Sequence, residues 1–257
     1  MIDTHTHLYD QAFDPDRAEV VARARAAGVS ACILPAIDQS TWQAQQACSG
    51  FFSGFCHSAS GLHPTSVNEN FREELDFARQ TLPSAVAVGE IGIDAYWSRE
   101  FLKEQVEVFE EQLSWAAEKD LPVIIHCRSA FPELLESLRR TRSSGLRGIL
   151  HAWSGSTEVF TEANRYGHFL MGIGGVITYK NTHLVNVLQK TSLTEIVLET
   201  DAPWLTPSPF RGHRNESSYL TYILAKVAEI KGLSPEETDS RTTQNALSLF
   251  NLKPCNE

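Results

Sequence analysis

Short apolar runs rich in β-branched residues alternate with longer stretches of helical periodicity along this chain. A buried parallel strand is typically a continuous apolar run of about four to eight residues that is bounded by turn residues. Eight segments fit this description, and they cover residues 1–7, 31–37, 56–62, 85–91, 122–127, 148–152, 168–173 and 195–200. The pattern therefore predicts eight strands, each followed by a helical segment.

The clearest helical pattern covers residues 101–119. Its apolar positions recur at steps of three and four, at Leu102, Val106, Phe109, Leu113 and Ala116. Asp14-Pro15 and Ser234-Pro235 have the composition of helix starts, and Gly28 has that of a helix end. We therefore expect one helix to run from the first of these prolines to Gly28, and a last helix to begin at the second.

The regular alternation of strand and helix predicts a parallel sheet with right-handed crossovers. The chain has 257 residues, close to the roughly 250 residues typical of a (β/α)8 barrel. We predict an α/β protein that forms a single TIM barrel over residues 1–257, with the active site at the C-terminal ends of the strands. A doubly wound open sheet is the alternative, although no glycine-rich phosphate turn follows the first strand.

Composition and charge narrow the class of protein. The chain is 42% hydrophobic and 21% charged, as in an ordinary globular domain. Its five cysteines form no C-x-x-C pair, and they are Cys32, Cys48, Cys56, Cys127 and Cys255. The N-terminus has no signal-peptide pattern, and no apolar run approaches the roughly 18 residues of a membrane span. We therefore expect a cytoplasmic protein without membrane contact.

The formal net charge is −10, which disfavours a protein that simply coats a nucleic acid. Local basic clusters or bound divalent cations can still reverse the sign of the potential inside one cleft. The charge therefore limits how a polyanion binds, without excluding one as a substrate.

Unusual polar residues stand at the ends of the predicted strands. They are His5, His7, His63, Glu90, His126, His151 and Asp201. Side chains alternate along a strand, so His5 and His7 face the same side. Imidazoles and carboxylates are ligands for Zn²⁺, Mn²⁺ and similar divalent ions. Each residue alone is more simply explained as a hydrogen-bonded structural group, a helix cap or an ion-pair partner, but their coincidence at independent strand ends favours a metal site.

Four of these histidines, His5, His7, His126 and His151, together with the two carboxylates exceed what one tetrahedral ion requires. We therefore expect two divalent ions, whose identity (Mg²⁺, Mn²⁺ or Zn²⁺) the sequence leaves open. The first would bind His5, His7, Glu90 and Asp201, and the second Glu90, His126 and His151. Such a pair activates a bridging hydroxide for hydrolysis. Asp201 is also a candidate for the group that orients the attacking water.

The motifs that carry these residues resemble, in order, the signature blocks of the TatD-type deoxyribonucleases of the amidohydrolase superfamily. They are D-T-H-T-H, G-L-H-P, G-E-I-G-I-D, H-C-R, H-A-W-S-G, E-T-D-A-P-W-L-T-P and F-R-G-H-R-N-E, and they span essentially the whole chain. The resemblance implies a metal-dependent hydrolase of DNA phosphodiesters, commonly a 3′-to-5′ exonuclease on single strands that is assayed with Mg²⁺. It implies metal ligation by the same six residues and a phosphate-facing role for His63 and Arg128.

This sequence departs from the family pattern at three places. Thr65 stands where a second histidine is usual, Ala152-Trp153 where Cys-Phe is usual, and Ser217 where proline is usual. None of these changes removes a metal ligand, so they bear on substrate preference rather than on the chemistry.

The remaining cleft residues help to choose between reactions. Arg128 shares the face of His126, where a guanidinium suits a phosphate, although an ion pair with Asp94 or Glu199 is the alternative. Arg211, His213 and Arg214 form a basic rim or an ordinary solvated cluster. The aromatic residues near this end of the barrel either stack unpaired bases or pack under loops, and they are Tyr96, Trp97, Trp153, Trp204 and Phe210.

We therefore predict a nuclease whose substrate is single-stranded DNA, without an obligate protein partner. Its catalytic residues would be Asp201, Glu90, His63 and Arg128, and its substrate contacts His63, Arg128, Trp153, Arg211 and Arg214. The alternatives are an amidohydrolase-type enzyme that cleaves C–N bonds or carboxyl esters, and a non-catalytic scaffold that keeps its metal for stability.

Overall fold

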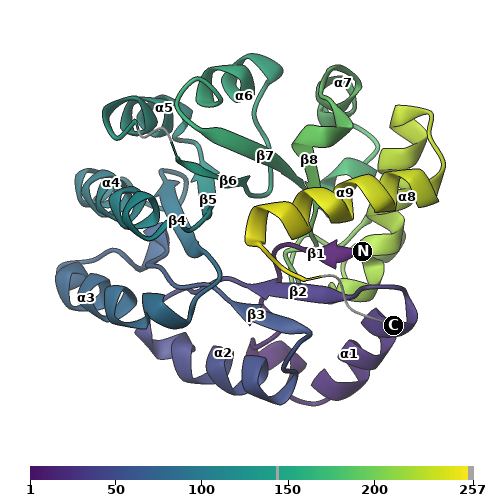
Figure 1. Ribbon diagram of the computed structural model, residues 1–257, viewed down its shortest axis with the longest axis horizontal. Coiled ribbons are helices and arrows are strands. Elements are labelled where there is room, and N and C mark those ends of the chain that lie inside the picture. Colours follow the sequence, from purple (N-terminus) through teal and green to yellow (C-terminus); the bar gives the residue numbers. More distant parts are fainter. Residues whose placement is uncertain (143–144, 254–257) are drawn as a thin grey trace.

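The computed structural model describes residues 1–142 and 145–253, so Cys255 lies outside the described residues. Eight parallel strands are followed in turn by helices (Figure 1). The strands are β1 (Ile2–Asp3), β2 (Ala31–Leu34), β3 (Cys56–Ser58), β4 (Val88–Asp94), β5 (Val123–Arg128), β6 (Arg147–Leu150), β7 (His168–Ile173) and β8 (Ile196–Leu198). The helices are α1 (Arg17–Ala26), α2 (Gln39–Phe51), α3 (Phe71–Thr81), α4 (Leu102–Lys119), α5 (Phe131–Arg140), α6 (Thr157–Ala163), α7 (Leu184–Lys190), α8 (Leu220–Lys231) and α9 (Pro235–Phe250).

The strands form two ladders, β1-β2-β3 and β4-β5-β6-β7-β8. Backbone hydrogen bonds join the ladders at both seams. Gly89 N–H donates to the Ser60 carbonyl at 2.8 Å, and Thr4 N–H donates to the Leu198 carbonyl at 3.1 Å. A parallel bridge between Thr6 and Ala202 extends the second seam. The sheet is therefore closed, and the predicted TIM barrel is confirmed.

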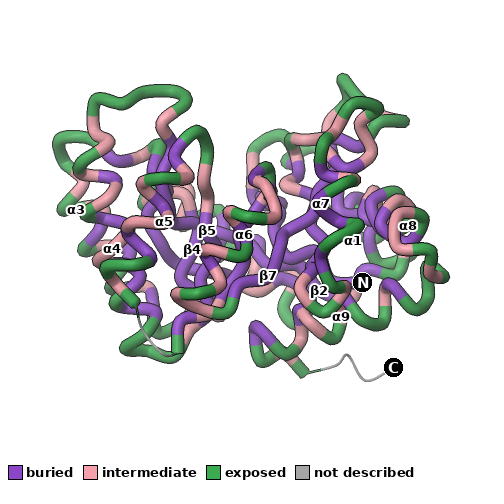
Figure 2. The backbone as a smooth tube through the Cα atoms, turned by 90° about the horizontal axis from the view of Figure 1, so that it is seen from above, coloured by how far each residue is buried: buried purple, intermediate pink, exposed green. Residues whose placement is uncertain are grey.

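Alternate strand residues fill the inside of the barrel. Ile33, Ile124 and Ile149 belong to an interior cluster, whereas their strand neighbours pack outward against the helices. Leu249 and Phe250 of α9 join the interior cluster, and α9 crosses the end of the barrel where the strands begin (Figure 1). Figure 2 shows buried strands surrounded by helices whose outer faces are exposed. Because α9 covers this end of the barrel, an active site is expected at the opposite end, where the strands finish.

Several element boundaries differ from the sequence-based predictions. Strand β1 is shorter than predicted because the chain bends at Thr4 and His5. Strand β4 continues to Asp94, so Glu90 lies within it, at a bulge between Gly89 and Ile91. The predicted last helix is confirmed, since Ser234 caps α9 by accepting a hydrogen bond from Glu237 N–H.

The predicted start of the first helix at Asp14-Pro15 is wrong. Helix α1 begins at Arg17, and the Asp16 side chain makes no capping hydrogen bond. Asp16 instead pairs with Arg214 at 2.7 Å and with Arg23 at 3.1 Å. Asp14, the predicted cap, instead ends a short 3-10 helix at Gln11–Phe13 with helical backbone angles, and its carboxylate pairs with Arg17 at 2.6 Å. The predicted end is confirmed, because Gly28 follows the helix with a φ of +88°.

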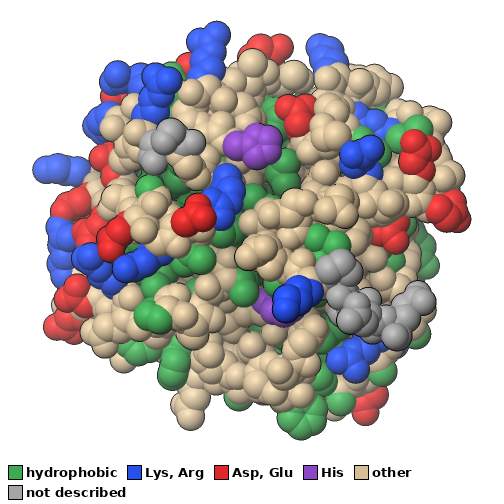
Figure 3. Space-filling model, in the orientation of Figure 1, with side chains coloured by type: hydrophobic (Ala, Val, Ile, Leu, Met, Phe, Trp, Pro, Cys, Tyr) green, Lys and Arg blue, Asp and Glu red, His purple; other side chains and the backbone are tan. Residues whose placement is uncertain are grey.

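None of the helices in the described part of the chain is long and apolar enough to cross a membrane. Basic and acidic side chains are interspersed on the face that α9 crosses (Figure 3).

Candidate metal centre

Glu90 stands at the centre of a buried cluster at the C-terminal end of the barrel. Its Oε2 atom lies 3.1 Å from His5 Nε2 and 3.8 Å from His7 Nε2. Its Oε1 atom lies 3.0 Å from His126 Nδ1 and 3.3 Å from His63 Nε2. The two oxygens of one carboxylate therefore face two different groups of imidazoles.

Asp201 closes the other side of the cluster. Its Oδ1 atom lies 3.5 Å from His5 Nε2 and 3.6 Å from the Nε2 atoms of both His7 and His151. Closure of the barrel produces this arrangement, because Asp201 N–H donates to the His5 carbonyl at 2.9 Å. All six predicted ligands, which come from five strand ends, are thus brought together.

Tyr9 determines which nitrogen of His7 faces the cluster. The tyrosine hydroxyl donates its single hydrogen to the Pro35 carbonyl at 2.7 Å, and it lies 2.9 Å from His7 Nδ1. The hydroxyl must therefore accept a hydrogen bond from His7 Nδ1–H. This tautomer leaves the lone pair of Nε2 free to bind a metal.

Two buried carboxylates hold two further ligand rings. Asp94 Oδ2 lies 2.9 Å from His126 Nε2, and Glu199 Oε1 lies 3.0 Å from His151 Nδ1. Such partners fix the orientation of metal-binding imidazoles and increase their basicity. From the sequence, Asp94 and Glu199 were considered only as ion-pair partners of Arg128. The role of Glu199 beside the metal centre could have been inferred from its position two residues before Asp201, which places both carboxylates on the same face of the chain.

His63 differs from the other histidines of the cluster. Both the backbone N–H of Thr65, at 3.1 Å, and its hydroxyl, at 2.6 Å, contact His63 Nδ1. A backbone N–H can only donate, so Nδ1 accepts and the neutral ring carries its proton on Nε2. His63 therefore presents a hydrogen-bond donor to the centre, a geometry that suits an oxygen atom of a substrate. Thr65, where the family usually has histidine, maintains this tautomer.

The charges of the cluster are strongly coupled. Burial favours the neutral forms of Glu90 and Asp201, but the surrounding imidazoles outweigh it and lower the pKa of both carboxyls. Burial likewise opposes protonation of the histidines, yet Asp94 and Glu90 raise the pKa of His126 to about 9. Glu199, Asp201 and Glu90 raise the pKa of His151 to about 10. Burial lowers the pKa of His5 and His63, so protons on His126 and His151 balance the buried carboxylates when no metal is bound.

This donor set fits divalent cations. Imidazole nitrogens and carboxylate oxygens converge from opposite sides, and a divalent ion would replace the protons that otherwise compensate the carboxylates. His5 Nδ1 is buried without a hydrogen-bond partner among the described residues. The ring is instead held by stacking on His151, with ring centroids 3.4 Å apart.

The predicted substrate contacts separate into two groups. Arg128 is exposed and lies over the ring of Tyr96 at 3.7 Å, and Arg211 lies over Tyr179 at 4.4 Å. Neither arginine forms an ion pair within residues 1–142 and 145–253, so the alternative pairing of Arg128 with Asp94 or Glu199 is wrong.

The other two predicted contacts have structural partners. Arg214 forms the ion pair with Asp16 and covers the ring of Phe13 at 4.7 Å. Trp153 is buried and packs against Phe131 and Phe160. Burial leaves Trp153 no free face on which a base could stack, so this placement argues against the predicted contact.

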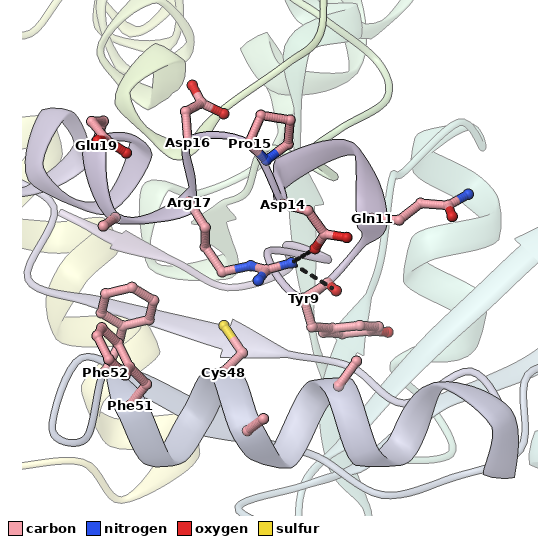
Figure 4. A pocket seen from close by; sticks show the side chains of 13 residues that line it. Tyr9, Gln11, Asp14, Pro15, Asp16, Arg17, Glu19, Cys48, Phe51 and Phe52 are labelled. Carbon is pink, nitrogen blue, oxygen red and sulfur yellow. Dashed lines mark hydrogen bonds and ion pairs between the residues drawn. The ribbon is translucent and has the colours of Figure 1, made fainter.

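A separate cavity of about 530 Å³ lies outside the barrel, between α2 and the segment that precedes α1 (Figure 4). Its wall includes Phe51, Cys48 and Arg17, whose guanidinium bonds Asp14. It shares Tyr9 with the metal centre but contains none of the predicted ligands.

Comparison with known proteins agrees with the geometry. A family model described as "TatD related DNase" matches residues 2–251. "Uncharacterized metal-dependent hydrolase YabD" of Bacillus subtilis is 35% identical over 256 residues, 98% of this chain and 99% of that protein. "3'-5' ssDNA/RNA exonuclease TatD" of Klebsiella pneumoniae is 34% identical over 98% of both chains.

A solved structure shows the same architecture. The crystal structure of YjjV, a TatD homologue from Escherichia coli, superposes with a TM-score of 0.87 at 30% identity and covers 98% of each chain. The match extends over the whole barrel and includes the segments that supply the clustered histidines and carboxylates. The chain therefore belongs to the TatD family and is a metal-dependent hydrolase of ester bonds.

Proposed function

We propose that this protein is an exonuclease that removes nucleotides from the 3′ end of single-stranded DNA with two divalent ions. The observation that carries the proposal is the position of Glu90, whose two carboxylate oxygens face separate groups of imidazoles. A carboxylate in this position suits a bridge between two ions about 3.5–4 Å apart. The name of the Klebsiella relative, a 3′-5′ ssDNA/RNA exonuclease, supports the substrate class.

The residues divide between two positions. One ion would be held by His5, His7, Glu90 and Asp201, and the other by Glu90, His126 and His151. When bound, the ions would acidify a water molecule and place positive charge beside the phosphate.

The chain's own groups would then orient the reactants. Asp201 is the more accessible central carboxylate, with 15% of its side chain exposed against 3% for Glu90. It would accept a hydrogen bond from the attacking water and hold it in line with phosphorus. His63 Nε2–H would donate to a nonbridging phosphate oxygen. The guanidinium of Arg128 would bind the DNA strand at the edge of the site.

The direct test is hydrolysis of single-stranded DNA labelled at either end, with Mg²⁺, Mn²⁺ or Zn²⁺ added. We expect mononucleotides to leave from the 3′ end. Carboxyl p-nitrophenyl esters and dipeptides serve as competing substrates, and their hydrolysis without cleavage of DNA would favour the amidohydrolase-type alternative.

Asp201→Asn separates catalysis from folding. We expect it to lower kcat on DNA at least 100-fold, because the amide can neither take a proton nor bind a cation as a carboxylate does. The thermal melting temperature of the metal-free protein should stay close to the wild-type value. A near-normal kcat would remove Asp201 from the mechanism.

A further inference from the structure

Two large aromatic side chains are unusually exposed beside the metal centre. Tyr96 has 56% of its surface exposed and Trp97 has 71%, although both follow directly from the buried strand β4. Their rings meet edge to face, with centroids 5.0 Å apart. Arg128, from the end of β5, lies 3.7 Å from the Tyr96 ring centroid and 5.3 Å from that of Trp97. We call these three residues the aromatic rim.

The carboxylate of Asp94 connects the aromatic rim to the metal centre through hydrogen bonds. Asp94 Oδ1 accepts hydrogen bonds from the backbone N–H groups of Tyr96, at 2.9 Å, and of Trp97, at 3.3 Å. Its other oxygen, Oδ2, holds His126 at 2.9 Å. The turn that presents the aromatic rings is thus fixed relative to a metal ligand, which gives the rim a defined place at the end of the barrel.

The chemistry of the rim is that of a nucleotide site. Arg128 covers one face of Tyr96, so the free aromatic surface belongs mainly to Trp97. No carboxylate of the described residues lies within ion-pair distance of Arg128, because Asp94 and Glu199 pair with histidines, so its N–H groups are free to bind an anion. An exposed indole beside an unpaired guanidinium matches a base joined to a phosphate.

We propose that the aromatic rim binds an unpaired nucleobase, which stacks on Trp97 while Arg128 contacts the adjoining phosphate. The inference rests on the proposed hydrolysis of DNA and deepens it by assigning a base-binding subsite. A base in a duplex keeps both faces stacked on its neighbours, so a site of this kind selects single strands. It also selects nucleotides over small esters, which have no base to stack.

Matched oligonucleotides test the subsite. One single strand carries normal bases throughout, and a second of equal length carries abasic tetrahydrofuran residues near its 3′ end. We expect the wild-type enzyme to show a lower KM for the strand with bases. Trp97→Ala should raise that KM by about 5- to 150-fold, the range one stacked base contributes, and abolish the preference over the abasic strand. Trp97→Phe should retain most of the preference for the strand with bases.

Phe51→Ala is the control, because Phe51 is 78% exposed on α2, outside the metal centre. It should leave both KM values unchanged. Trp97→Ala with an undiminished preference for the base-bearing strand would overturn the inference, while the proposed function would stand. Absence of DNA hydrolysis by the wild-type enzyme with every metal tested would instead overturn the proposed function.

Discussion

The histidines proposed as metal ligands differ in the group that holds the ring nitrogen facing away from the candidate metal centre. His126 and His151 use the carboxylates Asp94 and Glu199, whereas His7 uses the neutral hydroxyl of Tyr9. A neutral partner fixes the tautomer without adding charge. Tyr9 is buried and cannot turn to another partner without breaking its hydrogen bond to Pro35.

Tyr9→Phe removes the acceptor for His7 Nδ1–H while preserving the packing of the ring. We expect the affinity for Mn²⁺ to fall by about 10- to 100-fold, the usual cost of losing a hydrogen-bond partner of a metal ligand. Isothermal titration calorimetry of the metal-free protein measures this directly. Tyr222→Phe, at a residue that is 41% exposed on α8, is the matched control. Equal affinities for the two variants would show that Tyr9 does not orient the ligand.

At the level of single residues, the sequence predicted the six residues that meet at the centre, because each stands at or near a strand end. Their hydrogen-bond partners were harder to predict. Arg214 and Trp153 have the residue types of nucleic-acid contacts, but their surroundings bury or pair them. The sequence does not show which arginine meets an acid from a distant segment.

Among the elements, α9 has a role beyond covering the outside of the barrel. Phe250 and Leu249 close the end at which the strands begin, next to Ile2. This helix therefore completes the interior core beneath the proposed metal ligands at the other end.

Phe250→Ala tests that role. Truncation of a buried phenylalanine costs about 3–5 kcal/mol because it loses apolar burial and leaves a cavity. We expect a loss of this size in the free energy of unfolding, measured by urea denaturation. Phe51→Ala, at an exposed position, should change the free energy by less than about 0.5 kcal/mol. Equal losses for the two variants would mean that α9 does not complete the core.

Helix α1 is joined to the loop that follows β8 by the Asp16 ion pairs. Arg214 and Arg23 lower the pKa of Asp16 from 3.8 to about 2. A carboxyl with a lowered folded-state pKa stabilises the fold above its unfolded pKa and loses this contribution as the pH falls through the folded value. The contribution is thus present above about pH 4 and is lost as the pH falls towards 2.

We expect the melting temperature of Asp16→Asn to fall below that of the wild type at pH 6 and to converge with it near pH 2. Differential scanning calorimetry between these values follows the difference. A difference in melting temperature that stays constant from pH 6 to pH 2 would show that the ionised carboxylate of Asp16 does not stabilise the contact between α1 and the loop after β8.

The order of the elements was predictable because apolar runs and helical periodicity are local properties. The residues at which the elements begin and end were harder to predict, because contacts with distant residues compete with local sequence signals. The predicted helix start at Asp14-Pro15 was wrong because Asp14 ends a separate 3-10 helix at Gln11–Phe13 and pairs with Arg17. Strand β4 exceeded its predicted end because pairing with β5 continues to Asp94 and Arg128.

For the molecule as a whole, closure of the barrel turns the first and last strands into neighbours. Residues some 200 positions apart, such as His5 and Asp201, then share one side of the metal centre. The sequence predicted this closure from the number of strands and the chain length. It could not predict the bulge in β4 at which Glu90 lies. Nor could it predict that each carboxylate oxygen of Glu90 would face a different group of imidazoles.

The central claim is that Glu90 bridges two metal ions, and a crystal grown with Mn²⁺ tests it most directly. An anomalous difference map should show two peaks about 3.5–4 Å apart, one beside His5 and His7 and the other beside His126, with Glu90 between them. A single peak, or two peaks that do not share Glu90, would contradict the account.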